Sequence, residues 1–242
     1  MTSYGLENCT IDELRKMARE MELPSRRSKS DAIADITKAF KEYEKYKSSK
    51  IDRYKRLNVI GKGKEGTTYS VTDRKGNEYA MKTFRKKKSS NTLLAEYDLQ
   101  KRAAMMGIAP KVYNHDIVSK YIVMQKMDGH LLDIMIKQKG HLTKNQQHRI
   151  IEIFQKLDEA KVFHGDANLM NYMIYNKQIY IIDFGFAKPI DSQLVKKLRT
   201  NRPNSTIMLL GFILKLKEKN CPPSAYRYLS SQLSEEDSKL LE

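Results

Sequence analysis

The sequence is poor in the features that mark secreted and membrane proteins. Cysteine occurs only as Cys9 and Cys221 in 242 residues, so we expect two free thiols in a reducing compartment rather than a disulfide framework. The longest apolar run, Ile207–Leu214, is far shorter than the roughly 20 residues that cross a bilayer. The opening residues, MTSYGLENCT, lack the apolar core of a secretory signal. These absences favour an intracellular protein of the cytoplasm or nucleus.

Acidic side chains are scarce relative to basic ones. The formal net charge is +16, from 45 Lys and Arg against 29 Asp and Glu. Residues 1–50 hold 11 basic against 9 acidic side chains, and the remainder holds 34 against 20. Basic clusters lie at Arg85–Lys88, Lys196–Arg202 and Lys215–Lys219. Such a surface attracts DNA or another polyanion. The alternative interpretation is a basic surface of a soluble protein that binds no particular partner.

Residues 1–47 have the pattern of a small helix–link–helix unit. Thr10 and Glu13 form a capping box before the first helix, Pro24 ends that helix, and Ser30 is placed to cap the second. The link between them is basic. The unit resembles a SAP-type module, and this resemblance implies DNA contacts from Arg26, Arg27 and Lys29. The alternative is a helical hairpin that only packs on its neighbour, and in either case a charged linker is expected over 48–53.

The next segment changes to strands and glycine. Strands are predicted over 54–60, 67–72 and 78–84, and Gly61, Gly63 and Gly66 lie between the first two. Glycines there let backbone amides approach phosphates, although a flexible hairpin loop has the same pattern. The third strand carries Lys82, and a helix predicted from Ser90 to Met106 carries Glu96. This pair can hold an ammonium against phosphate oxygens, or it is an ordinary surface ion pair.

Residues 162–186, VFHGDANLMNYMIYNKQIYIIDFGF, concentrate the chemistry of the chain. Two short strands, 172–175 and 178–182, are joined by a predicted tight turn at Asn176 and Lys177. Asp166 and Asn171 precede this hairpin, and Asp183 follows it. Two carboxylates and an amide that meet at one end of a hairpin suit Mg²⁺, which prefers oxygen ligands. The alternative is a core hairpin with solvated Asp residues at its ends.

In their order and spacing, these motifs resemble the protein-kinase-like fold over about residues 54–215. The resemblance implies an α+β, bilobal fold with an N-lobe over about 54–127 and a C-lobe over about 128–242. The C-lobe is short for this fold, so several peptide-docking helices are expected to be missing. The helix–link–helix unit precedes it. ATP and Mg²⁺ are the implied cofactors, and a protein hydroxyl is the implied phosphate acceptor.

The resemblance also implies a role for each matching residue. The glycine-rich loop covers the ATP phosphates, and Lys82 contacts the α- and β-phosphates while it pairs with Glu96. Asp166 accepts the proton of the substrate hydroxyl, and Asn171 and Asp183 hold Mg²⁺. The residues expected at the adenine are Ile60, Ala80, Met124 and the backbone from Gln125 to Met127.

The sequence departs from the family pattern in four places. Gly165 replaces the Arg that reads a phosphorylated activation loop, and Asn168 replaces a Lys that contacts the γ-phosphate. No APE-like segment follows Gly185, and the predicted helix 207–216 lacks its usual N-terminal Asp, with Ser205 and Thr206 there instead. The HGD motif and short C-lobe resemble atypical kinases, including the small kinase of the tRNA-threonylcarbamoyl complex, the RIO family and aminoglycoside phosphotransferases.

Three functions fit these observations. The first is an atypical serine/threonine protein kinase that DNA recruits; a SAP-like module before a small kinase is similar to kinases of large DNA viruses, which would place it inside a host cell. The second is a pseudokinase scaffold anchored on nucleic acid, which Asn168 favours. The third is a small-molecule kinase. It would need an acidic pocket for a cationic acceptor, whereas the C-terminal part is basic.

Overall fold

The chain forms two compact units, Met1–Lys55 and Arg56–Glu242. The computed structural model describes residues 6–51 and 53–240, with side chains described over 6–42 and 53–240. Among the helices of these residues, each is too short or too polar to span a bilayer.

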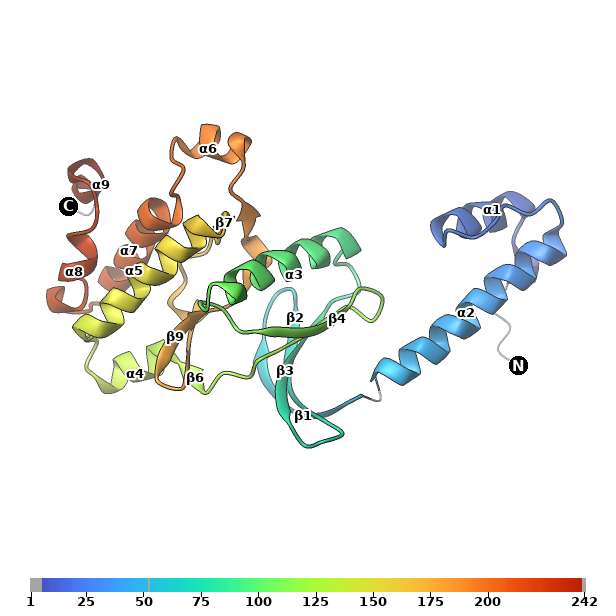
Figure 1. Ribbon diagram of the computed structural model, residues 1–242, viewed down its shortest axis with the longest axis horizontal. Helices are drawn as coiled ribbons and strands as arrows, with labels where there is room; N and C mark the ends of the chain where they lie inside the picture. Colours follow the sequence, from blue (N-terminus) through green and yellow to red (C-terminus); the bar gives the residue numbers. More distant parts are fainter. Residues whose placement is uncertain (1–5, 52, 241–242) are drawn as a thin grey trace. The chain divides into compact units, whose positions relative to one another are not determined.

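The first unit is two helices joined by a short link (Figure 1). A single 3₁₀ turn, Leu6–Asn8, precedes α1 (Ile11–Glu20) and α2 (Lys29–Ile51). The predicted capping box is confirmed, because the Thr10 N–H donates to Glu13 Oε2 at 2.7 Å and the Glu13 N–H donates to Thr10 Oγ1 at 3.3 Å. Leu14, Ala18 and Ile36 are buried where the helices meet.

The start and end of α2 differ from the prediction. The predicted cap, Ser30, is wrong: α2 begins at Lys29, and the Asp31 N–H donates to Ser28 Oγ at 3.4 Å. The helix continues to Ile51, so most of the stretch predicted as a linker, 48–53, is helical. Lys and Glu, which are strong helix formers, are frequent over residues 41–50, and no Gly or Pro interrupts the sequence from there to Ile51.

The second unit begins with a five-stranded antiparallel sheet in the order β1-β2-β3-β5-β4. Helix α3 covers one face of this sheet (Figure 1). Its Leu93 belongs to one buried hydrophobic cluster with Phe84 and Ile122 of the sheet. The bounds are β1 Tyr54–Lys62, β2 Gly66–Asp73, β3 Glu78–Phe84, α3 Ser90–Met105, β4 Val112–Asp116 and β5 Tyr121–Met124.

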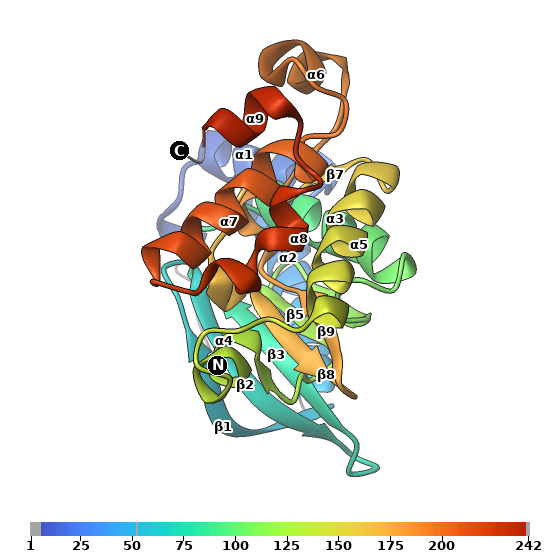
Figure 2. The same ribbon diagram turned by 90° about the vertical axis from the view of Figure 1, so that its left-hand side faces the viewer.

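Helices dominate the rest of this unit, where α5, α7 and α8 pack beside a small sheet ordered β6-β8-β9 (Figure 2). Strand β7 pairs with β10 separately. Phe154, Tyr172 and Phe212 pack edge to face in the core. The bounds are β6 Gly129–His130, α4 Leu131–Lys137, α5 Lys144–Glu159, β7 Val162–Phe163, η2 Leu169–Asn171, β8 Tyr172–Tyr175, β9 Gln178–Ile181, η3 Phe184–Phe186, β10 Lys188–Pro189, α6 Ser192–Leu198, η4 Asn204–Met208, α7 Leu209–Glu218, η5 Pro223–Ala225, α8 Arg227–Ser230 and α9 Glu235–Lys239.

The glycine-rich loop is a tight hairpin between β1 and β2. Strand β1 runs through Gly61, and β2 already begins at Gly66, so only residues 63–65 form the loop. The Gly63 N–H donates to the Gly66 carbonyl oxygen at 2.9 Å. A Cβ atom at Gly66 would lie 1.9 Å from the Thr83 carbonyl oxygen, whereas one at Gly63 would meet no atom within 4 Å. Close strand pairing therefore requires glycine at position 66 but not at position 63.

We expect Gly66→Ala to lower the free energy of unfolding by about 2 kcal/mol or more, because β2 and β3 must separate to admit the methyl group. Gly63→Ala is the matched control and should stay within about 0.5 kcal/mol of the wild type. Urea or thermal unfolding of the two variants measures the difference. Equal stability of both would contradict the tight pairing at Gly66.

Candidate active site

The β8–β9 hairpin brings polar side chains together at one end. Asn176 and Lys177 form its turn, both with positive φ (48° and 64°), which matches the right-handed twist of a two-residue hairpin. At the opposite end, the Ile182 N–H donates to the Asn171 carbonyl oxygen at 2.8 Å. The amide Nδ2 of Asn171 donates to Asp166 Oδ2 at 2.9 Å. The structure therefore places Asp166 and Asn171 in contact, beside the strand that leads to Asp183.

Lys82 connects the sheet to Asp183. Its Nζ donates to Glu96 Oε1 at 2.6 Å and to Asp183 Oδ1 at 2.7 Å. Burial by itself lowers the pKa of Lys82, but the charges of Glu96 and Asp183 outweigh it and raise that pKa. Burial by itself raises the pKa of Asp183, but Lys82 and the Gly185 N–H outweigh it and lower that pKa. Lys82 and Asp183 are therefore both ionised at neutral pH.

The backbone at Asp183 is held in an unusual conformation. Asp183 has φ = 66°, in the left-handed region that non-glycine residues seldom adopt and that often marks functional sites. The next side chain, Phe184, is buried, and its ring packs edge to face on His164 with centroids 5.0 Å apart. Burial of this phenylalanine fixes the direction of the preceding carboxylate.

His164 links the two acidic segments. Its Nδ1 lies 3.1 Å from the Asp166 carbonyl oxygen, and its Nε2 lies 3.0 Å from the Ile182 carbonyl oxygen. Complete burial lowers the pKa of His164, so the ring is neutral at pH 7 and donates to one of these carbonyls. The side chain therefore positions the backbone of Asp166 and of the residue before Asp183.

The carboxylate of Asp166 is oriented by two donors. The Asn168 N–H donates to its Oδ1 at 3.1 Å, and Asn171 donates to its Oδ2. Asn168 uses its own Oδ1 to accept the Met170 N–H at 3.0 Å, so it caps the η2 turn. Where the family pattern has a lysine for the phosphate, this chain therefore has a structural cap.

Gly165 has a local reason to be glycine. Its φ is +78°, and a Cβ atom there would lie 3.1 Å from the Phe186 carbonyl oxygen. A side chain would be strained by the backbone and crowded by the segment after Asp183. The missing arginine is thus tied to the close approach of these two segments.

The donor set fits Mg²⁺. Because Asn171 turns its Nδ2 toward Asp166, its Oδ1 remains as an oxygen ligand, and Asp183 keeps Oδ2 while Oδ1 accepts from Lys82. The described residues contain no group of three or more His, Cys, Asp or Glu placed to form a metal cage. Protein sites for Mg²⁺ usually supply only one or two ligands, and substrate phosphates and water supply the rest.

The residues predicted at the adenine lie on three strands of the sheet, β1, β3 and β5, and on the segment after β5. Ala80 and Met124 are buried and pair across β3 and β5. Ile60 is 46% exposed. The Gln125 N–H donates to the Lys111 carbonyl oxygen at 2.8 Å, so within the predicted stretch from Gln125 to Met127 this amide is already used by the protein.

Sequence reasoning missed the polar contact that anchors the start of this site. Asn204 is completely buried, and its Oδ1 accepts the backbone N–H of His164 at 3.1 Å. Its Nδ2 donates to Asp158 Oδ1 at 2.7 Å and to the Val162 carbonyl oxygen at 2.8 Å. Asp158 also accepts from the N–H and the hydroxyl of Ser205. The available signals were Asp158 within an apolar helix face and Asn204 next to the predicted helix, which begins with a π turn, η4.

The predicted nucleic-acid contacts are in the first unit. Arg26 Nε donates to Asp35 Oδ2 at 2.7 Å, and Lys29 Nζ donates to the Glu7 carbonyl oxygen at 2.9 Å. Arg27 is exposed. In this structure, two of the three cations thus have partners within their own unit.

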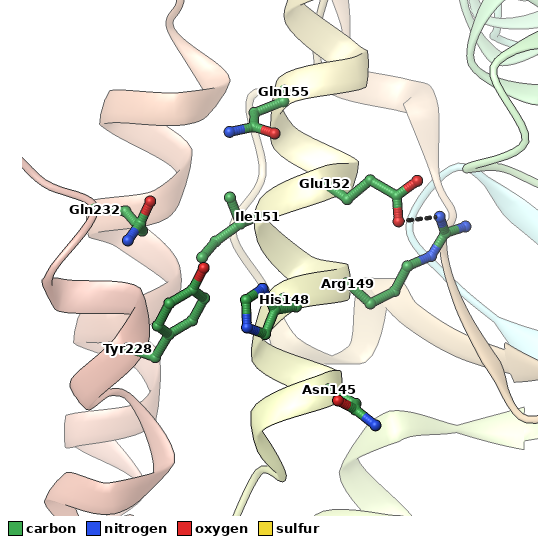
Figure 3. A pocket seen from close by; sticks show the side chains of 8 residues that line it. All are labelled: Asn145, His148, Arg149, Ile151, Glu152, Gln155, Tyr228 and Gln232. Carbon is green, nitrogen blue, oxygen red and sulfur yellow. Dashed lines mark hydrogen bonds and ion pairs between the residues drawn. The ribbon is translucent and has the colours of Figure 1, made fainter.

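A separate hollow of about 480 Å³ lies between α5 and α8 (Figure 3). His148 and Tyr228 stack across it with ring centroids 4.1 Å apart. The guanidinium of Arg149, which lines the hollow, already donates hydrogen bonds to the Glu152 carboxylate and to the carbonyl oxygens of Ile179 and Gly107. None of the predicted site residues lines this hollow.

Comparison with known proteins shows the family of this chain. The protein kinase domain model matches residues 54–204, and the chain belongs to the protein kinase family. Calcium-dependent protein kinase 7 of Arabidopsis thaliana is 31% identical over an alignment of 150 residues, and the match covers 54% of this chain and 28% of that protein.

Two further relatives match shorter segments. A provisionally named serine/threonine-protein kinase of Acanthamoeba polyphaga mimivirus is 37% identical over 78 residues, covering 31% of this chain and 12% of that protein. A provisionally named bifunctional tRNA threonylcarbamoyladenosine biosynthesis protein of Methanococcus vannielii is 34% identical over 83 residues, covering 34% and 14%. The chain spans less than a third of the length of these relatives.

The Asn204 anchor leads to a prediction about its buried amide. Asn204→Asp replaces an amide donor with a carboxylate beside buried Asp158, so it should cost about 3 kcal/mol of stability or more. Chemical unfolding measures this cost. Asp158→Asn in the same chain should recover part of it, because one of the two facing carboxylates is removed.

Asn201→Asp is the matched control. It makes the same change of charge at an exposed position three residues earlier and should shift stability by no more than about 0.5 kcal/mol. If Asn204→Asp were as stable as this control, the amide would not be the group that joins Asp158 to the Val162–His164 backbone.

Proposed function

We propose that this protein is an atypical serine/threonine protein kinase that uses ATP and Mg²⁺ to phosphorylate a protein hydroxyl. One observation carries the proposal: Lys82 is bonded at once to Glu96 of α3 and to Asp183 of the other lobe. These two carboxylates hold the ammonium between the lobes, where phosphate oxygens are expected.

Each of the remaining polar groups has a task in this reaction. The carboxylate of Asp166, oriented by Asn171 and the Asn168 N–H, accepts the proton of the acceptor hydroxyl. The oxygens of Asn171 and Asp183 hold Mg²⁺, which when bound neutralises charge on the phosphates. The amides of the glycine-rich loop cover the phosphate chain, and Ala80 and Met124 offer an apolar surface to the adenine.

Nucleotide binding without transfer is the second candidate. Its support is Asn168, whose side chain caps a turn where a phosphate-binding lysine is usual. In that case the protein is a scaffold that holds nucleotide, and Asp166 has no proton to accept.

A γ-phosphate transfer assay on acidic and basic protein substrates, with and without DNA, separates these candidates. The wild type should transfer phosphate, and Asp166→Ala should lower the rate by about 100-fold or more, because the general base is lost. Lys82→Ala and Asp183→Ala should also abolish turnover. Glu96 keeps a second lysine partner, Lys88, so Lys82→Ala does not leave it as an unpaired buried charge.

The exposed Asp133→Ala is the matched control and should retain wild-type activity. If the wild type and Asp166→Ala were equally silent on all substrates with Mg²⁺ or Mn²⁺, the kinase proposal would fail. Calorimetry with ATP would then show whether the protein still binds nucleotide.

We also propose that DNA recruits the protein through the first unit. The support is the link of α1 and α2, which places Arg26, Arg27 and Lys29 within four residues. Contacts of this kind are to phosphates and are sensitive to salt.

The Arg26→Ala/Arg27→Ala/Lys29→Ala variant should flatten the dependence of log affinity on log salt by about 0.9 for each phosphate contact removed. Fluorescence anisotropy of duplex DNA at several salt concentrations measures this slope. The control neutralises Arg19, Lys38 and Lys41, exposed cations of the same unit outside the link. An unchanged slope in the link variant would assign binding to another cluster, such as Lys196–Arg202.

A further inference from the structure

A second buried lysine lies beside the Lys82–Glu96 pair. The side chain of Lys88, in the loop between β3 and α3, is only 7% exposed. Its Nζ donates to Glu65 Oε2 and to Glu96 Oε2, and it lies 4.5 Å from the centre of the Phe84 ring. Lysine is rarely buried unless it is paired, and here both partners are carboxylates of the candidate active site.

The loop that carries Lys88 is itself fixed. Lys120 Nζ donates to the carbonyl oxygens of Lys86 and Lys88, and the Lys88 N–H donates to the Arg85 carbonyl oxygen at 3.0 Å. The backbone that carries Lys88 is therefore constrained, whereas a lysine on a mobile surface loop would sample many directions. This constraint holds the Lys88 ammonium near Glu65 and Glu96.

Glu65 is at the tip of the glycine-rich loop. Its carbonyl oxygen accepts the Arg85 N–H at 2.9 Å, so backbone and side chain both join the tip to the β3–α3 loop. The carboxylate also reaches the other lobe, because a Cβ atom at Gly185 would lie 2.9 Å from Glu65 Oε2 and 3.4 Å from Asp183 Oδ1. The tip therefore lies over Asp183 and Gly185.

Five alternating charges result, in the order Asp183, Lys82, Glu96, Lys88 and Glu65. Lys88 is the cation that separates Glu65 from Glu96 and compensates a carboxylate close to Asp183. Without it, the charge of Glu65 would face Asp183 and the phosphates of a nucleotide, and like charges so close repel strongly. The loop tip would then be pushed away from the nucleotide site.

We propose that Lys88 is a positioning residue that holds the glycine-rich loop closed through Glu65 and α3 in place through Glu96. The inference rests on the proposed nucleotide-binding function. It explains how the site is assembled although Gly165 stands where the family has an arginine that reads a phosphorylated segment. The restraint on α3 comes from within the same lobe and needs no modification of the segment after Asp183.

The test compares Lys88→Gln with Lys87→Gln, an exposed lysine one residue earlier in the same loop. Calorimetry with a non-hydrolysable ATP analogue and Mg²⁺ should show about tenfold weaker binding for Lys88→Gln and no change for Lys87→Gln. Steady-state kinetics should show that KM for ATP rises more than kcat falls. Lys88→Arg keeps the charge and should recover affinity to within about threefold.

A double-mutant cycle identifies Glu65 as the partner. Glu65→Gln should weaken analogue binding less than Lys88→Gln, and the double variant should bind no more weakly than Lys88→Gln alone, because the two side chains act through one contact. Independent, additive losses would overturn the link to the loop tip. So would a Lys88→Gln protein that is less stable to heat yet binds the analogue as the wild type does.

Hydrogen exchange of the protein without nucleotide separates this inference from the proposed function. Lys88→Gln should speed exchange at residues 63–66 and 90–96 by about tenfold relative to Lys87→Gln. If the wild type bound no analogue, but exchange were still faster in Lys88→Gln than in Lys87→Gln, the proposed function would fail and the positioning role of Lys88 would stand. Equal exchange and equal affinity in the two variants would overturn the inference.

Discussion

The ammonium of Lys82 is the contact on which the candidate active site depends. Its two carboxylate partners lie on different lobes, and one of them, Asp183, is 101 residues away in the sequence. A buried ion pair is stable only when its geometry satisfies each charge, because desolvation opposes it. Here each carboxylate lies within hydrogen-bonding distance of the ammonium, so one side chain joins the two lobes.

The opposite side of the site is held by neutral and acidic polar groups. Asn204 and Asp158 fix the backbone at Val162 and His164, and the His164 ring lies between the carbonyl oxygens of Asp166 and Ile182 and donates to one of them. A buried network of hydrogen bonds of this kind favours one arrangement over others. The contacts that position the segment of Asp166 are thus made by a buried amide and a buried carboxylate, Asn204 and Asp158.

The departures from the family pattern have separate physical explanations. A side chain at position 165 would crowd the Phe186 carbonyl oxygen, and the side chain of Asn168 accepts a backbone N–H to cap the η2 turn. Neither change removes Asn171, Asp183 or Lys82. Each change serves the local backbone, and the other polar groups of the candidate active site remain in contact.

Local patterns in the sequence were sufficient for most of the elements. The capping box of Thr10, the turn at Asn176 and the helix that carries Glu96 depend on neighbours within a few residues, and the structure contains all three. The predicted pairing of Lys82 with Glu96 is also present. The errors were boundaries, such as Ser28 in place of Ser30 as the cap of α2, where adjacent serines offer the same chemistry.

By itself, the sequence determined which polar groups are available and in what order, because short-range spacing sets strands, turns and caps. Only the tertiary structure decided which of them touch. Asp158 meets Asn204 across 46 residues, Lys88 meets Glu65 across 23, and Gly165 faces Phe186 through space. Such contacts depend on the angle at which two packed segments cross and on the direction of each side chain. The spacing of residues along one segment determines neither the angle nor the direction.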